Sequence, residues 1–263
     1  MKTSFIHAKV RLFDGLAFYL DGNSKITWGN GTYEEPTPNA LSLPHISCCP
    51  GSTERCRASC YVHGLRAHVP ELYKLYELNE MALHSVLMTP GCMQLASEIL
   101  ADWITKNAAG GFRWHVSGDV FSQKHARFIR DTCLEAPDVP FWIYTRTLDA
   151  VPLLVQAKNL SVNVSADAEN FARAKLVAQL NDARLCYLVS SPDEAIPELP
   201  EDSVIFPDYP LRGRDRDEPT EHPWWKALPQ ASKRIVCVAD FFGQSSTSRC
   251  GPCDRCLYPK ETT

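Results

Sequence analysis

The sequence lacks any long run of apolar residues. No segment approaches the roughly 20 uninterrupted apolar residues that a membrane-spanning helix needs. The first residues, Met1 to Val10, also lack the apolar core of a secretory signal peptide. We therefore expect a cytoplasmic protein that makes no contact with a membrane.

The sequence also lacks an excess of positive charge. Its 27 Lys and Arg residues stand against 31 Asp and Glu residues, which gives a formal net charge of -4. This balance excludes a global basic field that would recruit a polyanion, so any contact with nucleic acid must be local. The chain shows no internal repeat and no low-complexity tract. Its 44% apolar and 22% charged residues are typical of an ordinary globular protein.

Cysteine, in contrast, is abundant, with 11 residues in the chain. Thiols stay reduced in the cytoplasm and disulfides are rarely structural there, so grouped cysteines indicate metal or redox chemistry. Cys49, Cys56 and Cys60, with Cys48 beside them, lie in one turn-rich segment. The alternative is that they are free, buried cysteines, but the polarity of the segment favours one soft metal site.

A second group, Cys250, Cys253 and Cys256, forms a C-x-x-C-x-x-C array near the C-terminus. This spacing occurs in both zinc and iron–sulfur sites. Its fourth ligand is open, and the candidates are Cys237, Cys48 and Cys92. Cys133 and Cys186 lie in apolar helix and strand patterns, and we interpret them as core residues.

Strand-like and helix-like patterns alternate along most of the chain, which is typical of βα units and a parallel sheet. We expect strands at Leu41–Ile46, Phe112–Val116, Val139–Thr145, Leu160–Val164, Arg184–Val189, Ser203–Phe206 and Arg234–Val238. We expect helices at Val69–Met88, Cys92–Lys106, Gln123–Leu134, Leu148–Ala157 and Ala168–Leu180, and a short one near Ala195.

This order predicts an α/β fold, a complete or partial TIM-like (β/α) barrel, with an open doubly wound sheet as the alternative. Residues 1–40 mix short β-like runs with turn signals and are interpreted as a β-hairpin cap. The barrel then spans residues 41–240, and residues 241–263 form a cysteine-rich tail that a metal would order.

A three-cysteine loop after the first strand of a βα barrel resembles the radical S-adenosylmethionine (SAM) enzymes. Their usual spacing is C-x3-C-x2-C, whereas this chain has C-x6-C-x3-C. Ser117-Gly118-Asp119 is similar to the Gly-Gly-Glu motif of that superfamily, and Ser165-Ala166-Asp167 to its strand-four motif. Tyr144-Thr145-Arg146 ends a further strand between them. The same set of motifs, over roughly residues 41–256, also resembles a bacteriophage family called gene product 88.

The resemblance implies a [4Fe–4S] cluster held by Cys49, Cys56 and Cys60, with the fourth iron open for SAM. It further implies cofactor contacts from Ser117, Gly118, Asp119, Ser165, Asp167 and Tyr61, and catalytic roles for Arg146 and Asp119. A reductant such as flavodoxin or ferredoxin would supply the electron that cleaves SAM to a 5′-deoxyadenosyl radical. Cys250, Cys253 and Cys256 would hold a second [4Fe–4S] cluster, or zinc.

Each of these residues has a simpler interpretation. Asp119 and Asp167 precede expected helices and are suitable helix caps, and Arg146 has Asp149 nearby as a surface partner.

The substrate is not apparent from the chain. The phage resemblance suggests a modified nucleobase in viral DNA, acted on in the host cytoplasm. The charged loop Arg212–Glu218 with Trp224 and Trp225 is a possible nucleotide contact, although a solvated surface is the ordinary interpretation. Two other classes of function stay open. One is a non-catalytic zinc protein or nucleic-acid-binding module, and the other is an iron–sulfur redox protein without SAM chemistry.

Overall fold

A computed structural model describes residues 7–22, 37–191, 193–208, 218–242, 253, 255 and 256. Most of the expected β-hairpin cap beyond residue 22, including the β-like run Ile26–Trp28 and the turn residues Gly29–Gly31, lies outside the described residues, as do Cys250 and residues 212–217 of the charged loop. No helix among the residues described is long and apolar enough to cross a membrane.

The described strands form one mixed sheet of eight in the order β1 to β8. β1 and β2 form an antiparallel hairpin, β2 pairs antiparallel with β3, and β3 to β8 run parallel. Their bounds are Ala8–Arg11, Ala17–Asp21, Ala40–Leu41, Phe112–Trp114, Phe141–Thr145, Leu160–Ala166, Arg184–Val189 and Val204–Pro207. The order contains no reversal, which a doubly wound sheet would have. The N-terminal hairpin is therefore the edge of the main sheet, not a separate cap.

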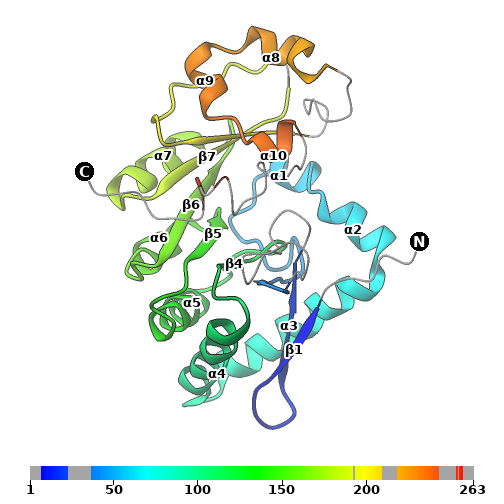
Figure 1. The fold of residues 1–263 in the computed structure, drawn as a ribbon, viewed down its shortest axis with the longest axis vertical. Coiled ribbons are helices and arrows are strands. Elements are labelled where there is room, and N and C mark those ends of the chain that lie inside the picture. Colours follow the sequence, from blue (N-terminus) through cyan, green and yellow to red (C-terminus); the bar gives the residue numbers. More distant parts are fainter. Residues whose placement is uncertain are drawn as a thin grey trace.

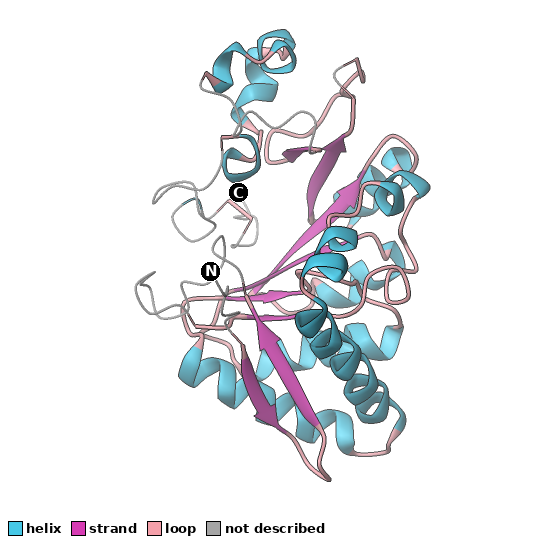
Figure 2. Cartoon of the chain, turned by 90° about the vertical axis from the view of Figure 1, so that its right-hand side faces the viewer, coloured by secondary structure: helices cyan, strands magenta, loops and turns pink. Residues whose placement is uncertain are grey.

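The helices follow the strands as the alternation predicts. Their bounds are α1 Glu54–Ala58, α2 Val62–His68, α3 Pro70–Met88, α4 Cys92–Asn107, α5 Gln123–Glu135, α6 Val151–Leu154, α7 Phe171–Leu180, α8 Pro223–Ala227, α9 Gln230–Arg234 and α10 Val238–Phe241. Helices α4, α5, α6 and α7 follow one another along one side of the sheet (Figure 1), and Figure 2 shows most of the helices on that side.

Three expected elements differ from the structure. The first parallel strand is only Ala40–Leu41, because Pro44 lacks the N–H that would continue the ladder. The segment around Ala195 has no helix, and Pro197 and Pro200 disfavour one. Arg234–Val238 is not a strand: α9 ends at Arg234 and α10 begins at Val238. Only Val236 pairs with the sheet, through a parallel bridge to Ile205.

The two faces of the parallel sheet differ in polarity. Trp114 and Tyr187 face the helices, where their rings contact Phe128 of α5 and Phe171 of α7. Since side chains alternate along a strand, the residues between them face the other side. That opposite face carries the polar residues Arg113, Ser161, Asn163, Ser165, Arg184 and Cys186 beside the aromatic residues Trp142 and Tyr144. Parallel sheets are usually apolar on both faces, so this polar face indicates a site.

Candidate functional site

The cysteine loop after β3 is anchored through backbone groups of α1. Thr53 caps this helix by accepting a hydrogen bond from the amide of Cys56 at 3.0 Å. The carboxylate of Glu169 accepts from the amides of Glu54 and Arg55 at 3.0 and 2.8 Å. These bonds satisfy donors that a helix start otherwise leaves unpaired.

The loop also lies directly on the end of β5. A Cβ atom on Gly51 would be 2.2 Å from the carbonyl oxygen of Arg146, closer than any side-chain atom tolerates. Only glycine therefore allows this contact, which places the cysteines over the carboxyl ends of the parallel strands.

The three thiols of the loop are partly buried and interact with one another. Burial raises the pKa of the Cys49 thiol to about 12, and Asp119, Cys56 and Cys60 raise it as well. Burial also raises the pKa of Cys56, while Arg146 lowers it through its charge and a hydrogen bond. The pKa of Cys60 is raised by burial and by Cys56. The three thiols are thus close enough to affect one another's pKa, although no three His, Cys, Asp or Glu side chains of the described ranges are already gathered as a metal-binding group.

Cys48 does not belong to this set. Its thiol is buried and donates to a carboxylate oxygen of Glu80 on α3 at 3.2 Å. Burial and this carboxylate raise its pKa far above the ordinary range. A neutral thiol with an acidic partner is a poor metal ligand, which favours Cys49, Cys56 and Cys60 as the loop's ligands.

The segment Ser117-Gly118-Asp119 follows β4 and runs beside the cysteine loop. The amide of Leu43 donates to the carbonyl of Ser117 at 2.8 Å, and the amide of Asp119 donates to that of Cys48 at 3.0 Å. Gly118 has φ +82°, and a Cβ there would lie 2.6 Å from the Cβ of Leu43. The hydroxyl of Ser117 is buried and has no hydrogen-bond partner among the residues described. A buried hydroxyl of this kind fits a ligand contact.

Asp119 is the centre of a buried network at the ends of β4, β5 and β6. Its carboxylate accepts from the Thr145 hydroxyl at 2.6 Å, the Val120 amide at 2.7 Å and the Arg146 amide at 2.8 Å. Burial raises the pKa of Asp119, and these hydrogen bonds lower it. The guanidinium of Arg146 donates to Asp167 at 2.8 Å, and the hydroxyl of Thr53 donates to the same oxygen at 2.6 Å.

The structure bears on the simpler interpretations of Asp119, Arg146 and Asp167. Helix α5 is capped by Ser122, and Asp119 is not its cap. Arg146 pairs with Asp167, whereas Asp149 pairs with Arg173 on the surface. Asp167 accepts a hydrogen bond from the amide of Glu169 at 2.9 Å, but the N-cap position of α7 is held by Asn170 and not by Asp167. The three residues therefore form one buried group.

Two further expected residues lie at the same edge of the sheet. The exposed Tyr61 donates its hydroxyl to the carbonyl of Val116, which joins the cysteine loop to the end of β4. Ser165 is half-buried near the end of β6, on the polar face beside Cys186. Thr53 and Glu169, which fix the loop, escaped the sequence analysis. The one sequence signal for Thr53 is its position directly before a helix with a polar first turn, where threonine is a common cap.

The C-terminal residues are described only in part. The carbonyl of Cys256 accepts from the side-chain amide of Asn163 on β6 at 3.1 Å, so this segment reaches the polar face. Trp224 is buried and packs on Phe241, with ring centroids 5.5 Å apart. Trp224 therefore belongs to the core and offers no stacking surface for a nucleotide. Trp225 is half-buried and stacks on Phe241, with ring centroids 4.6 Å apart. Because residues 212–217 lie outside the described part of the chain, the expected nucleotide contact of the charged loop stays a prediction.

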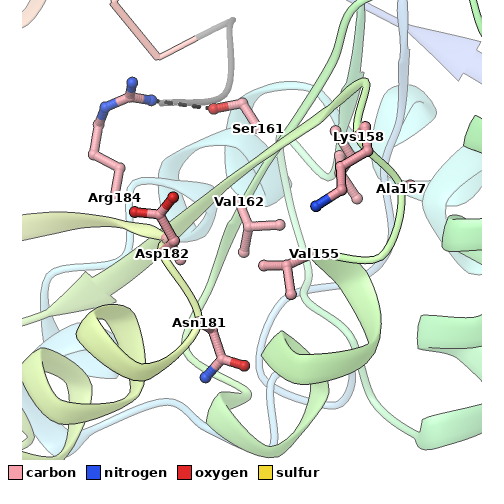
Figure 3. Close-up of a pocket in the computed structure, with 10 residues that line it drawn as sticks. Val155, Ala157, Lys158, Ser161, Val162, Asn181, Asp182 and Arg184 are labelled. Carbon is pink, nitrogen blue, oxygen red and sulfur yellow. Dashed lines mark hydrogen bonds between the residues drawn. The ribbon is translucent and has the colours of Figure 1, made fainter. Parts of the chain in front are cut away.

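One pocket of about 310 Å³ lies at the opposite, amino ends of β6 and β7. Figure 3 shows the residues around it, including the 3.1 Å hydrogen bond from Arg184 to Ser161. Open parallel sheets bind ligands at their carboxyl ends. The cysteine loop and the Asp119 network meet at that end, so we regard it as the candidate site in preference to the pocket.

Comparisons with known proteins give the family. The family described as "Gene product 88" matches residues 16–258. "Gene 88 protein" of Mycobacterium phage D29 is 33% identical over 151 residues, and that of Mycobacterium phage L5 is 30% identical over 151 residues. Each match covers 53% of this chain and 61% of the relative. No solved structure matches this chain. Over residues 16–258, from the N-terminal hairpin to the C-terminal cysteines, this chain belongs to the gene product 88 family, whose relatives here come from bacteriophages.

Proposed function

We propose that this protein is a radical-SAM-type enzyme whose loop Cys49, Cys56 and Cys60 holds a [4Fe–4S] cluster. The observation that carries the proposal is the position of these thiols over the carboxyl ends of β4, β5 and β6, next to Asp119, Arg146 and Asp167. We further propose that the parallel strands form a partial barrel. The unbroken strand order and the single layer of consecutive helices support that arrangement.

The donor set fits such a group. Among the described residues, the neighbouring Cys48 donates to Glu80. Three thiolates would therefore hold the cluster and leave one of its irons open for SAM. When bound, such a cluster supplies the electron that splits SAM into methionine and a 5′-deoxyadenosyl radical, with flavodoxin or ferredoxin as the reductant. The thiols are protonated when free, so loading must release protons.

In this proposal, residues of the chain itself bind the cluster and SAM and hold them in position. Arg146 donates to Cys56, and its positive charge stabilises a thiolate there. Asp119 already accepts three hydrogen bonds, so in this proposal it is a positioning residue that fixes the backbone of Arg146. Ser117 offers a buried hydroxyl that we assign to the amino acid part of SAM, and Gly118, which packs on Leu43, fixes the turn that presents this hydroxyl. We assign further SAM contacts to Tyr61, beside the end of β4, and to Ser165, near the end of β6.

The substrate that we propose is a nucleobase of viral DNA. The support is the phage origin of the relatives, together with the polar side chains on one face of the sheet, which could hydrogen-bond a base. Deletion of the gene should then change the nucleoside profile of phage DNA. An unchanged profile, with no nucleotide bound by the purified protein, would contradict the DNA substrate and leave SAM cleavage untouched.

The decisive experiment is anaerobic reconstitution with iron and sulfide, followed by SAM and dithionite. We expect a brown protein that forms 5′-deoxyadenosine, measured by mass spectrometry. Cys56→Ser should abolish this product, whereas Cys133→Ser, which alters a buried thiol in α5, should retain it. A colourless protein that binds only zinc would overturn the proposal in favour of a zinc module. A full cluster without 5′-deoxyadenosine would indicate an iron–sulfur redox protein.

A further inference from the structure

Cys186 lies on the polar face of the sheet, and it is buried there. Its neighbour Tyr187 points to the helices and contacts the ring of Phe171 on α7. Because side chains alternate, Cys186 points to the opposite side, where it is paired with Ser165 of β6. A thiol in an all-apolar layer would be an ordinary core residue, but this one faces Asn163, Arg184 and the C-terminal segment.

Asn163 connects this thiol with the C-terminal cysteines. Its side-chain nitrogen donates to the carbonyl of Cys256 at 3.1 Å. Its side-chain oxygen lies 3.9 Å from the sulfur of Cys186. One amide thus bridges β7 and the C-terminal segment, which are distant in sequence.

A third cysteine, Cys237, lies next to β8 on the side away from β7. The amide of Cys237 donates to the carbonyl of Ile205 at 2.8 Å, and Ile205 is paired with Tyr187, the residue after Cys186. The segment around Cys237 therefore occupies the place of the next strand after β8 in the sheet. Cys253, the fourth, precedes Cys256 by a C-x-x-C spacing, which commonly brings two thiols to one metal.

The electrostatic interactions of these cysteines are consistent with their closeness. Burial raises the pKa of Cys186 well above the ordinary range, Cys256 and Cys237 raise it further, and Arg184 lowers it. Cys133 is equally buried in α5, and its raised pKa has no contribution from another cysteine. Arg184 also donates to Asn163 at 3.2 Å, so a cation stands beside the group and would offset the negative charge of several thiolates.

We infer that Cys186, Cys237, Cys253 and Cys256 together form a four-thiolate site for a thiophilic metal centre, zinc or iron–sulfur. This ligand set joins Cys253 and Cys256 of the C-terminal group to Cys186 and Cys237, and it replaces the interpretation of Cys186 as a core residue; Cys250 lies outside the described residues. The ligand set does not depend on SAM cleavage by the loop after β3. Among the residues described, the thiols are not gathered around one point, so metal binding would bring them together.

The test uses the full chain with Cys49, Cys56 and Cys60 all replaced by serine, so that only the second site remains. In this parent we expect zinc at one ion per chain, or iron with an equal amount of sulfide, by elemental and sulfide analysis. Adding Cys186→Ser or Cys237→Ser should weaken metal binding by at least about 10- to 100-fold, the loss known for disturbing a metal's surroundings. Adding Cys133→Ser is the matched control and should change nothing.

Cobalt(II) provides a second readout that does not depend on affinity. Its thiolate charge-transfer absorption should weaken in the Cys186→Ser and Cys237→Ser proteins, and circular dichroism at equal concentration verifies that they are folded. A metal-free parent would overturn the inference. So would full metal content and unchanged cobalt absorption in the two variants. Because the parent lacks the first three cysteines, neither result bears on the proposed SAM chemistry.

Discussion

The guanidinium of Arg146 donates to the carboxylate of Asp167 at 2.8 Å, and both side chains are buried. The hydroxyl of Thr53 donates to the same carboxylate oxygen, so this ion pair joins the end of β5, the end of β6 and the cysteine loop. Without the pair, the loop would lose one of the contacts that hold it to these strand ends. Three predictions concern this group and its surroundings, and a fourth concerns the buried Asp21 at the end of β2.

Replacing Arg146 with Met should destabilise the protein by about 3–5 kcal/mol, because a buried carboxylate loses its partner. The matched control is Arg173→Met. Arg173 pairs with Asp149 at the same 2.8 Å distance, but their side chains are 68% and 78% exposed. The control should cost no more than about 1 kcal/mol. Urea unfolding measures both, and equal losses would contradict the structural role of the buried pair.

Replacing Thr53 with Val keeps the shape of the side chain but removes its hydroxyl. The amide of Cys56 loses its cap and Asp167 loses a donor, so we expect a loss of about 1–2 kcal/mol. Thr105→Val, at an exposed position within α4, is the control and should be nearly neutral. The variant should also load less iron in anaerobic reconstitution, because its cysteine loop is less ordered. Unchanged stability and iron content would exclude Thr53 as an anchor.

Replacing Gly51 with Ala should disturb the site, since the added Cβ would overlap the carbonyl of Arg146. We expect a loss of about 1–3 kcal/mol, the usual cost of overpacking. In Gly64, within α2, an added Cβ meets nothing within 4 Å. Gly64→Ala should therefore stabilise by up to about 1 kcal/mol, as alanine is the better helix former. Thermal unfolding of both proteins tests the contrast, and a neutral Gly51→Ala would show that the loop does not lie on β5.

Asp21 should make stability depend on pH. Burial raises its pKa from 3.8 to about 6, although hydrogen bonds from Ser42 and Tyr76 lower it. Between these values the unfolded chain releases a proton that the folded protein retains, so the free energy of unfolding falls as pH rises. Asp21→Asn removes this contribution and should gain about 3 kcal/mol relative to wild type between about pH 4 and pH 7.5.

The comparison of the two proteins cancels other titrations, including that of His115, whose pKa is lowered to about 4 by burial. Asp102→Asn changes an exposed carboxylate in α4 and serves as the control, with no such trend. Chemical unfolding at each pH gives the free energies. A constant difference between Asp21→Asn and wild type across this range would refute the titration of Asp21.

Local sequence patterns predicted the elements whose hydrogen bonds and packing repeat regularly. The expected strands at Phe112, Leu160 and Arg184 and the helices at Cys92 and Gln123 are confirmed within a few residues. The expected βα order matches the unbroken series of parallel strands, whereas Arg234–Val238 is a helix end and a single bridge. The run Arg234–Val238 is too short to show the alternation of a strand or the periodicity of a helix, which explains why its prediction as a strand was wrong.

The sequence by itself determined the βα order, the grouping of Cys49, Cys56 and Cys60, and the motif around Asp119. Only the tertiary structure decided which partners these groups have. Asp149 is only three residues from Arg146 in the sequence, yet Arg146 pairs with Asp167. The register of β5 and β6 brings residues that are distant in the sequence together, whereas residues close in the sequence can point in different directions. For the same reason Cys186, an apparent core residue in its strand, lies beside Asn163 and the C-terminal cysteines. Local patterns record burial and periodicity, whereas contacts across the sheet depend on register that no single segment contains.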